Sequence, residues 1–244
     1  MKLRLTVAYD GRDFSGWQSQ KDGNAVQDHI ERAFRCLCPG RTVVHGAGRT
    51  DSGVHANGQC AHAEVPDDRL PAFQWAPALN AHLPGGIRIM RAEEAPVEFH
   101  ARFSARGKTY QYTVWNGPVL PPHDRGRAWH VVWRLDDSTM AAACALFEGT
   151  HDFAAYSAKR SKAAERTVRT VSSIRFHREG ERVTLTFSGE GFLYKMVRML
   201  SAAVVRCAAG KILLADLALP LHEGQPRFSH VAPAEGLNLL EVSY

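Results

Sequence analysis

The sequence predicts an α+β fold with a mainly antiparallel sheet flanked by helices. Both halves of the 244-residue chain contain stretches in which apolar and polar residues alternate, as expected for half-buried strands. Other stretches repeat apolar residues every three or four positions, as expected for helices with one buried face. Strands mixed with helices, and joined by hairpins as well as longer connections, are typical of this class.

The first half is predicted to begin with a strand and a helix. Alternation over 3–9 predicts the strand, and apolar residues at helical spacing predict a helix over 26–37. A glycine-rich run at 46–48 is expected to lie in a loop. A further strand is expected over 59–65, followed by a short helix around 73–79.

The second half repeats this mixture of elements. Alternation predicts strands over 110–114 and 183–187, and the proline- and glycine-rich stretch 117–127 is expected to be a surface connection. A helix is expected over 138–147, with the serine at its first position as the N-cap. Another is expected over 193–209, where the following glycine ends it.

The composition favours a folded protein with a weak preference for anionic partners. Charged residues make up 23% of the chain, which does not suggest a disordered or fibrous protein. The net charge is +5, with a sequence pI of about 9.1. This balance suits a phosphate-rich partner, because cationic side chains displace counterions condensed on a nucleic acid. A basic protein without such a partner is the alternative, and the charge alone favours neither strongly.

The five cysteines predict neither a disulfide framework nor a structural metal site. Their number is odd, and they form no CxxC pair and no zinc-type spacing with histidine. Free thiols suit a reducing cytosol, so we expect a cytoplasmic protein. The amino terminus lacks the apolar core of a signal peptide, and no run approaches the roughly 20 apolar residues of a membrane span.

The stretch 47–56 is the strongest candidate for a catalytic site. It is polar, lies between two predicted strands, and brings together Arg49, Asp51 and His55. Glycines within it allow backbone conformations and close approaches that a side chain would obstruct. Charged side chains on loops at sheet edges are common catalytic groups. From composition alone, an aspartate that caps a turn beside an exposed arginine is the more common arrangement.

The histidines do not predict a metal site. Twelve are scattered along the chain without an HExxH or comparable arrangement, and none is assigned to catalysis. A metal-dependent nuclease with Asp51 and His55 as ligands is one alternative function. The lack of a second acidic residue near this motif argues against it, and we expect no metal.

The string GRTDSGVHA, followed by Gly58-Gln59, closely resembles the catalytic motif of the TruA family of tRNA pseudouridine synthases. The resemblance covers almost the whole chain, since further family landmarks occur in the right order. They are Tyr9-Asp10-Gly11, Gly16-Trp17-Gln18, Val26-Gln27, Asn80 with Leu83-Pro84, Phe99 to Ala105, Lys108 with Tyr110 and Tyr112, Gly149 with His151-Asp152-Phe153, Met196-Val197-Arg198, Ala232-Pro233-Ala234 and Gly236-Leu237.

The resemblance implies that Asp51 is the nucleophile and that Arg198 is the partner of its carboxylate. A carboxylate must be ionised to attack, and burial opposes ionisation, whereas a nearby guanidinium favours the charged form. Arg198 lies in an apolar helical stretch, where a buried arginine without a partner is costly. An ordinary surface arginine is the alternative.

The resemblance implies that Tyr110 stacks on the target base and that Arg49 helps to extrude it. Stacking on an aromatic ring is worth about 1–3 kcal/mol per base. A base inside a stem must be flipped out before it is attacked, at a cost of a few kcal/mol. As alternatives, Tyr110 is a strand residue of the core, and Arg49 binds phosphate or is merely exposed.

The implied substrate is uridine at positions 38–40 in the anticodon stem-loop of tRNA. The family uses no cofactor, and its members usually form homodimers. By this resemblance the chain has two lobes around a basic cleft, residues 1–104 carrying Asp51 and residues 105–244 carrying Tyr110 and Arg198. A non-catalytic RNA-binding module of the same fold is the other alternative function.

Some residues have no settled role at this stage. The basic segment 159–169 is either a tRNA-contacting loop or a solvated charge run. Phe192 and Tyr194 are expected to wall the pocket, with core packing as the alternative for Phe192. Lys195 departs from residues often seen before the Met-Val-Arg triplet, and Ser52 stands where alanine is common, a small-for-small change.

Overall fold

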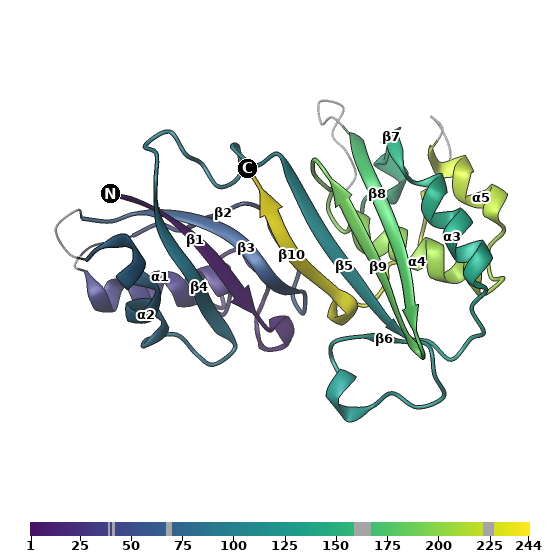
Figure 1. Cartoon of the computed structure of the whole chain (residues 1–244), viewed down its shortest axis with the longest axis horizontal. Coiled ribbons are helices and arrows are strands. Elements are labelled where there is room, and N and C mark those ends of the chain that lie inside the picture. The colour runs from purple at the N-terminus through teal and green to yellow at the C-terminus, as the bar shows by residue number, and fades with distance from the viewer. Residues whose placement is uncertain (39, 41, 67–69, 159–166, 222–226) are drawn as a thin grey trace. The chain divides into compact units, whose positions relative to one another are not determined.

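The computed structural model describes residues 1–244 apart from 39, 41, 67–69, 159–166 and 222–226 (Figure 1). The described chain divides into two compact units. Unit 1 consists of Met1–Arg106 and Asn238–Tyr244, and unit 2 of Gly107–Leu237. Among the described residues, no helix has the length and apolar character needed to cross a membrane.

Unit 1 is built on a sheet with the strand order β4-β1-β3-β10 (Figure 1). The bounds are β1 (Lys2–Tyr9), β2 (His45–Gly46), β3 (His55–Glu64), β4 (Ile87–Ala95) and β10 (Leu237–Ser243). β1 pairs antiparallel with both β3 and β4, whereas β10 runs parallel to β3. The short strand β2 pairs antiparallel with β3, so the loop after β2 begins beside the sheet.

Two helices of unit 1 pack against each other, α1 (Val26–Leu37) and α2 (Trp75–Asn80). Helix α1 begins where the Asp28 carboxylate accepts the Ala25 N–H at 3.0 Å, which satisfies a free amide of the first turn. Its apolar face is buried, and the ring of Phe34 lies 5.6 Å from that of Trp75. These contacts form the core of the unit together with the alternating buried residues of β1.

Unit 2 contains an antiparallel sheet with the strand order β5-β9-β8-β7. The bounds are β5 (Gly107–Trp115), β6 (Trp129–His130), β7 (Gly149–Asp152), β8 (Val168–Glu179) and β9 (Arg182–Gly189). β6 pairs parallel with the end of β5.

The helices of unit 2 are α3 (Asp137–Leu146), α4 (Met196–Ala208) and α5 (Leu214–Ala218). Helix α4 is buried at most of its positions, and α3 packs against both α4 and β8. Short 3-10 helices complete the two units: Gly11–Asp13, Ala72–Gln74, Pro122–Asp124, Ala154–Tyr156, Leu219–Leu221 and Ala234–Gly236.

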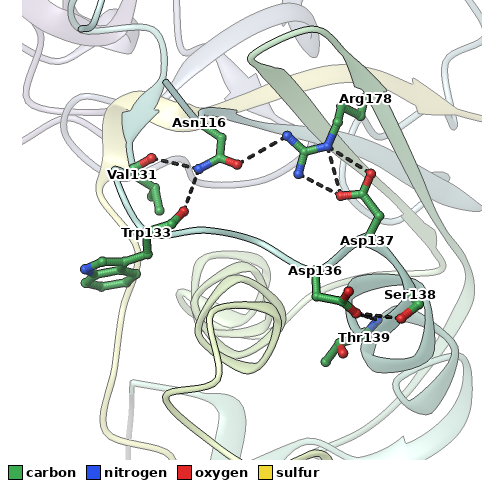
Figure 2. Close-up of polar contacts among 8 residues, drawn as sticks. All are labelled: Asn116, Val131, Trp133, Asp136, Asp137, Ser138, Thr139 and Arg178. Carbon is green, nitrogen blue, oxygen red and sulfur yellow. Dashed lines mark hydrogen bonds and ion pairs between the residues drawn. The ribbon is translucent and has the colours of Figure 1, made fainter. Parts of the chain in front are cut away.

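Polar side chains fasten α3 and the end of β5 to β8 (Figure 2). On β8, Arg178 donates from Nε to the Asp137 carboxylate at 2.9 Å and from Nη1 to the Asn116 Oδ1 at 3.2 Å. The Asn116 amide in turn donates to the carbonyls of Val131 and Trp133, at 2.9 and 2.8 Å. One guanidinium therefore hydrogen-bonds to both α3 and the end of β5, and links these two elements to β8.

The predicted N-cap of α3 is wrong by two residues. Asp136 is the cap, and its Oδ1 accepts the backbone N–H of Thr139 at 2.7 Å (Figure 2). The Ser138 hydroxyl donates to the same oxygen. These bonds, that of Ser138 foremost, lower the pKa of Asp136 to about 2. An ionised carboxylate two residues earlier is the stronger acceptor at a helix start, which explains why the helix begins there.

The α+β class with its mainly antiparallel sheet is confirmed, as are the strands predicted over 3–9, 110–114 and 183–187. The strand predicted from residue 59 begins at His55 instead, so the end of the catalytic motif is already part of the sheet. Strands β4, β8 and β10 were not predicted.

Candidate active site

The loop that carries Asp51 and Arg49 connects β2 to β3 in unit 1. It packs directly on the backbone at Gly16, where an added Cβ would lie 2.5 Å from the carbonyl oxygen of Thr50. Gly16 also has a left-handed φ of 88°, which side-chain-bearing residues rarely adopt. Next to it, the Trp17 N–H donates to the same Thr50 carbonyl at 3.1 Å. Glycine is therefore required at position 16 both for its conformation and for contact with the loop.

Two side chains from the sheet hold the loop on either side of Arg49. The buried Tyr9 hydroxyl lies 2.8 Å from the Thr50 hydroxyl. Burial raises the pKa of Tyr9 to about 12, so the phenol stays protonated and available for this contact. The fully buried Gln59 donates from its amide to the Gly48 carbonyl at 2.9 Å. These bonds satisfy loop groups that no strand ladder reaches.

The far end of the loop closes in a tight turn. The Val54 N–H donates to the Asp51 carbonyl at 3.2 Å, and Gly53 between them has a left-handed φ of 81°. The Ser52 hydroxyl donates to the Phe14 carbonyl at 3.2 Å. A side chain at Gly11 would clash with the Val54 carbonyl oxygen. The segment 11–16 therefore covers one side of this turn.

Within this loop Asp51 is half-buried and Arg49 is exposed. Arg49 donates from Nε to the Gln18 side-chain oxygen at 3.2 Å. Both residues that the motif predicts for this half of the chain therefore lie in the same supported loop.

His55 makes structural contacts at the first residue of β3. Its Nδ1 accepts the Gly11 N–H at 3.2 Å and lies 3.3 Å from the Asp10 carboxylate. Arg12 donates to that carboxylate through Nε and Nη2, at 2.9 and 2.6 Å, and lowers the pKa of Asp10 to about 2. Across the part of the chain that the structure describes, no group of three or more His, Cys, Asp or Glu side chains is placed to hold a metal ion.

Tyr110 lies on β5 of unit 2, opposite Phe187 in the antiparallel ladder with β9. Its side chain is 8% exposed. The ring of Phe192 meets it edge-on, with the ring centres 5.4 Å apart and the planes at 89°. This edge-to-face contact is a favourable aromatic geometry.

Arg198 lies in the first turn of α4 and is half-buried. Its Nε donates to the Ala232 carbonyl at 2.8 Å, and the Ala232 N–H donates back to the Arg198 carbonyl at 3.2 Å. The Tyr112 hydroxyl donates to the adjacent Pro233 carbonyl at 2.8 Å. An added Cβ at Gly236 would strike the Tyr112 ring. The segment 232–236, one of the family landmarks, therefore links Arg198 to β5.

Lys195, immediately before α4, has a left-handed φ of 60°, the one such non-glycine residue among those described. Its Nζ lies 5.1 Å from the centre of the exposed Tyr194 ring, a cation–π contact. The basic residues at 159–166 lie outside the described part of the chain, and Arg169 lies on β8.

The predicted site residues fall into two groups, Arg49 with Asp51 in unit 1 and Tyr110 with Arg198 in unit 2. The pairing of Asp51 with Arg198 remains a prediction. Tyr9, Gly16 and Gln59 support the loop, although sequence reasoning gave them no role. They stand among the family landmarks, which is the signal by which they could have been found.

Comparison with known proteins gives a consistent result. The family model described as tRNA pseudouridine synthase matches residues 5–104 and 143–244. Curated proteins named tRNA pseudouridine synthase A are similar along the whole chain. The protein from Akkermansia muciniphila is 47% identical, covering 100% of this chain and 95% of its own. The one from Solidesulfovibrio magneticus is 44% identical, covering 100% and 91%.

A third relative of that name, from Acetivibrio thermocellus, is 38% identical over 99% of both chains. A crystal structure of a Cbf5-Nop10-Gar1 complex is matched with a TM-score of 0.38 and 14% identity, over 97% of this chain and 48% of that one, too distant to support an argument. The family model and the full-length relatives define the class: this chain belongs to the tRNA pseudouridine synthase family. The predicted family and enzyme class are thereby confirmed.

Proposed function

We propose that this chain converts uridine to pseudouridine at positions 38–40 in the anticodon stem-loop of tRNA, with Asp51 as the nucleophile. The observation that carries the proposal is the support of the Asp51 loop. Gly16, Trp17 and Tyr9 all contact Thr50, the residue next to Asp51. A nucleophile must be held in a defined geometry to be effective, and so much support for a polar loop fits that need.

The reaction rearranges bonds within one nucleoside. Asp51 attacks either the base ring or the ribose carbon C1′, and the glycosidic bond between N1 and C1′ breaks. The freed uracil turns over, a bond forms between C5 and C1′, and the bond to Asp51 breaks so that the carboxylate is regenerated. The C5 proton leaves while N1 gains a proton. Substrate and product have the same composition, so the proposed chemistry needs no co-reactant. The carboxylate acts as a covalent catalyst that divides one difficult step into two easier ones.

The other site residues are proposed to act around this step. Arg198 would keep the Asp51 carboxylate charged, since a guanidinium nearby favours the ionised form. Tyr110 would stack on the flipped uracil, and its hydroxyl is our candidate for removing the C5 proton. Arg49 would help to extrude the uridine and occupy its place in the stem. In this proposal residues 1–104 supply the nucleophile and residues 105–244 supply its partners.

The proposed RNA partner suits the charge of the chain. A net charge of +5 favours phosphate contacts, and structured RNA is recognised largely by shape and backbone. We further propose that the chain acts as a homodimer, and that raising the salt concentration weakens tRNA binding steeply through counterion release.

The test is conversion of an unmodified tRNA transcript by the purified chain, with pseudouridine mapped at single-nucleotide resolution. We expect product at one or more of positions 38–40, and none there in transcripts that carry cytidine at those positions. Product only elsewhere in the tRNA would refute the proposed site. Binding without product would favour a non-catalytic RNA-binding module, and cleaved tRNA that a chelator protects would favour a metal-dependent nuclease.

A further inference from the structure

We infer that Gln18 and Gln27 are positioning residues for Arg49, at one end of a hydrogen-bonded relay that begins at Glu31. The inference rests on the proposed function, because it takes Arg49 to be the side chain that engages the RNA stem. All members of the relay lie in unit 1.

The relay reaches Arg49 through two amides. The Arg49 Nε donates to the Gln18 Oε1 at 3.2 Å, and the Gln18 Nε2 donates to the Gln27 Oε1 at 2.6 Å. The Gln27 oxygen also accepts the backbone N–H of Ser19 at 2.9 Å. Arg49 is exposed, whereas Gln27 is only 8% exposed, so the relay runs from the surface into the interior.

The buried end of the relay is anchored on Glu31 and Val44. The Gln27 Nε2 donates to the Glu31 Oε1 at 3.0 Å and to the Val44 carbonyl at 3.1 Å. The Val44 N–H donates to the same Glu31 oxygen at 3.1 Å. Glu31 is 8% exposed, and these bonds satisfy a carboxylate oxygen that would otherwise be costly to bury.

These contacts allow only one orientation of each amide. If the Gln27 amide were reversed, its NH₂ would face the Ser19 N–H, and its oxygen would face the Val44 carbonyl. Gln27 therefore presents its oxygen to Gln18, so the Gln18 NH₂ must point there and its oxygen must point to Arg49. A buried glutamate thereby determines that the surface arginine meets a hydrogen-bond acceptor.

A rigid element supports the relay. Gln27 is the second residue of α1, whose first turn is tied back to the Gly16 and Trp17 carbonyls by the N–H groups of Val26 and Gln27, at 3.0 and 3.1 Å. The same Gly16–Trp17 segment contacts the Asp51 loop at Thr50. The start of α1 thus sets the position of the Arg49 side chain and of the loop backbone together.

A neutral hydrogen-bond acceptor at position 18 suits an arginine that must be oriented and then released to RNA. An arginine side chain loses conformational freedom when it is fixed, so holding it in one conformation beforehand lowers the entropy cost of engaging RNA. A carboxylate at position 18 would hold the guanidinium more strongly and compete with the RNA for it. Glutamine orients Arg49 and adds no negative charge beside it.

The test is a double-mutant cycle on Gln18 and Arg49, measured as the single-turnover rate of pseudouridine formation. Gln18→Met keeps the side-chain length and removes both hydrogen-bonding ends, while the Gln27 oxygen keeps the Ser19 N–H. We expect Gln18→Met to slow the reaction about tenfold, the loss of one hydrogen bond to a charged group. The Kd for tRNA should stay within about twofold. In an Arg49→Ala background, Gln18→Met should have no further effect.

A second readout follows the base itself. A fluorescent 2-aminopurine next to the target uridine reports extrusion, which Gln18→Met should slow by the same factor as turnover. Gln20→Ala is the matched control, because Gln20 is an exposed glutamine in the same segment that donates to the Ser15 carbonyl. Equal thermal stability of the variants confirms that each is folded.

The outcomes separate the relay from the proposed function. The relay is overturned if Gln18→Met reacts like the unsubstituted chain, or if its loss is equally large without Arg49. An Arg49→Ala variant at full rate overturns the relay and the role of Arg49, but leaves Asp51 as the nucleophile. Absence of pseudouridine with the unsubstituted chain refutes the proposed function itself.

Discussion

The Asp51 loop of unit 1 and the Tyr110–Arg198 region of unit 2 are supported in different ways. Side chains and glycines from distant segments hold the loop, such as Tyr9, Gly16 and Gln59. Tyr110 and Arg198 instead lie on β5 and α4, whose own backbone hydrogen bonds fix them. A single substitution at a supporting residue should therefore disturb the geometry of the Asp51 loop more than that of the Tyr110–Arg198 region.

The residues of the two regions also contribute to activity in different ways. In unit 1 a supporting residue acts on the geometry of Asp51 without contacting RNA. In unit 2 the side chains themselves are proposed to act on the nucleophile and the base, while regular elements provide the support. Substitution of Tyr110 or Arg198 in unit 2 should therefore lower activity more than stability. Substitution of a supporting residue in unit 1 should lower both.

Among substitutions that leave the nucleophile in place, the largest effect is expected at Arg198. Arg198→Ala should lower kcat/KM on the order of 100-fold, because the proposed partner of Asp51 would be lost. Arg206→Ala, on the same helix, is the control and should leave kcat/KM nearly unchanged. Equal losses of kcat/KM in the two variants would indicate disruption of α4 and would contradict a specific role for Arg198.

Gly16→Ala should have the next largest effect. The new Cβ would meet the Thr50 carbonyl oxygen at 2.5 Å in a left-handed conformation, and we expect a loss of roughly 3 kcal/mol in the free energy of unfolding. Activity should fall with it, since the Asp51 loop must move. Gly23 is the matched position, with a φ of 64° and its nearest atom 3.9 Å away. Gly23→Ala should lower the free energy of unfolding by only about 1 kcal/mol. Equal losses for the two variants in urea unfolding would contradict the proposed contact between position 16 and the loop.

Tyr110 allows the ring and the hydroxyl to be tested separately. Tyr110→Ala should slow turnover about 30-fold, as stacking of roughly 1–3 kcal/mol is lost. Tyr110→Phe keeps the ring and its contact with Phe192, so tRNA binding should persist while turnover falls if the hydroxyl takes the C5 proton. Full turnover in Tyr110→Phe would remove the hydroxyl from that role and leave the ring as a stacking surface.

The smallest effect concerns a histidine cluster in unit 1. His62 is 5% exposed, and its Nδ1 accepts the Ala101 N–H at 3.1 Å. Its ring centre lies 4.6 Å from that of His100 and 5.0 Å from that of His45. Burial first, then His100, His45 and Lys2, lower the pKa of His62 to about 4, against the opposing charge of Glu64.

The sign of the pH effect follows from that pKa. Above pH 6.5, His62 is neutral in both the folded and the unfolded chain. As the pH falls from 6.5 toward 4, the unfolded chain binds a proton that the folded chain does not, and stability is lost. The loss should reach about 1 kcal/mol at pH 5.5. It should disappear in His62→Gln, whereas His123→Gln, at an exposed histidine, should keep it. An unchanged pH dependence in His62→Gln would contradict the assignment.

Uninterrupted alternation of buried positions makes a strand easy to predict from its sequence. Strands β1 and β9 bury every second residue, and both were predicted. Strand β8 has a register shift between Val171 and Ser173, so its buried residues Val171 and Ile174 stand three apart. β4 pairs with β1 across a similar irregularity. A bulge breaks the period of two, so alternation alone does not detect these strands.

For the site, sequence reasoning located the loop but not its supports. Family resemblance pointed to Asp51 and Arg49, whose roles remain predictions. The residues that hold them, such as Tyr9 and Gln27, lie far away in sequence, and a polar residue type does not reveal its partner. The need for glycine at position 16 depends on a contact with Thr50 that exists only in the folded chain.

Asp51→Asn tests the central claim most directly, since it removes the negative charge and keeps the shape of the side chain. The rate of pseudouridine formation in unmodified tRNA should be measured under single-turnover conditions, together with the Kd for tRNA. We predict no detectable product, with tRNA bound within a few-fold of the affinity of the unsubstituted chain. Product formation at a rate comparable to that of the unsubstituted chain would contradict the assignment of Asp51 as the nucleophile.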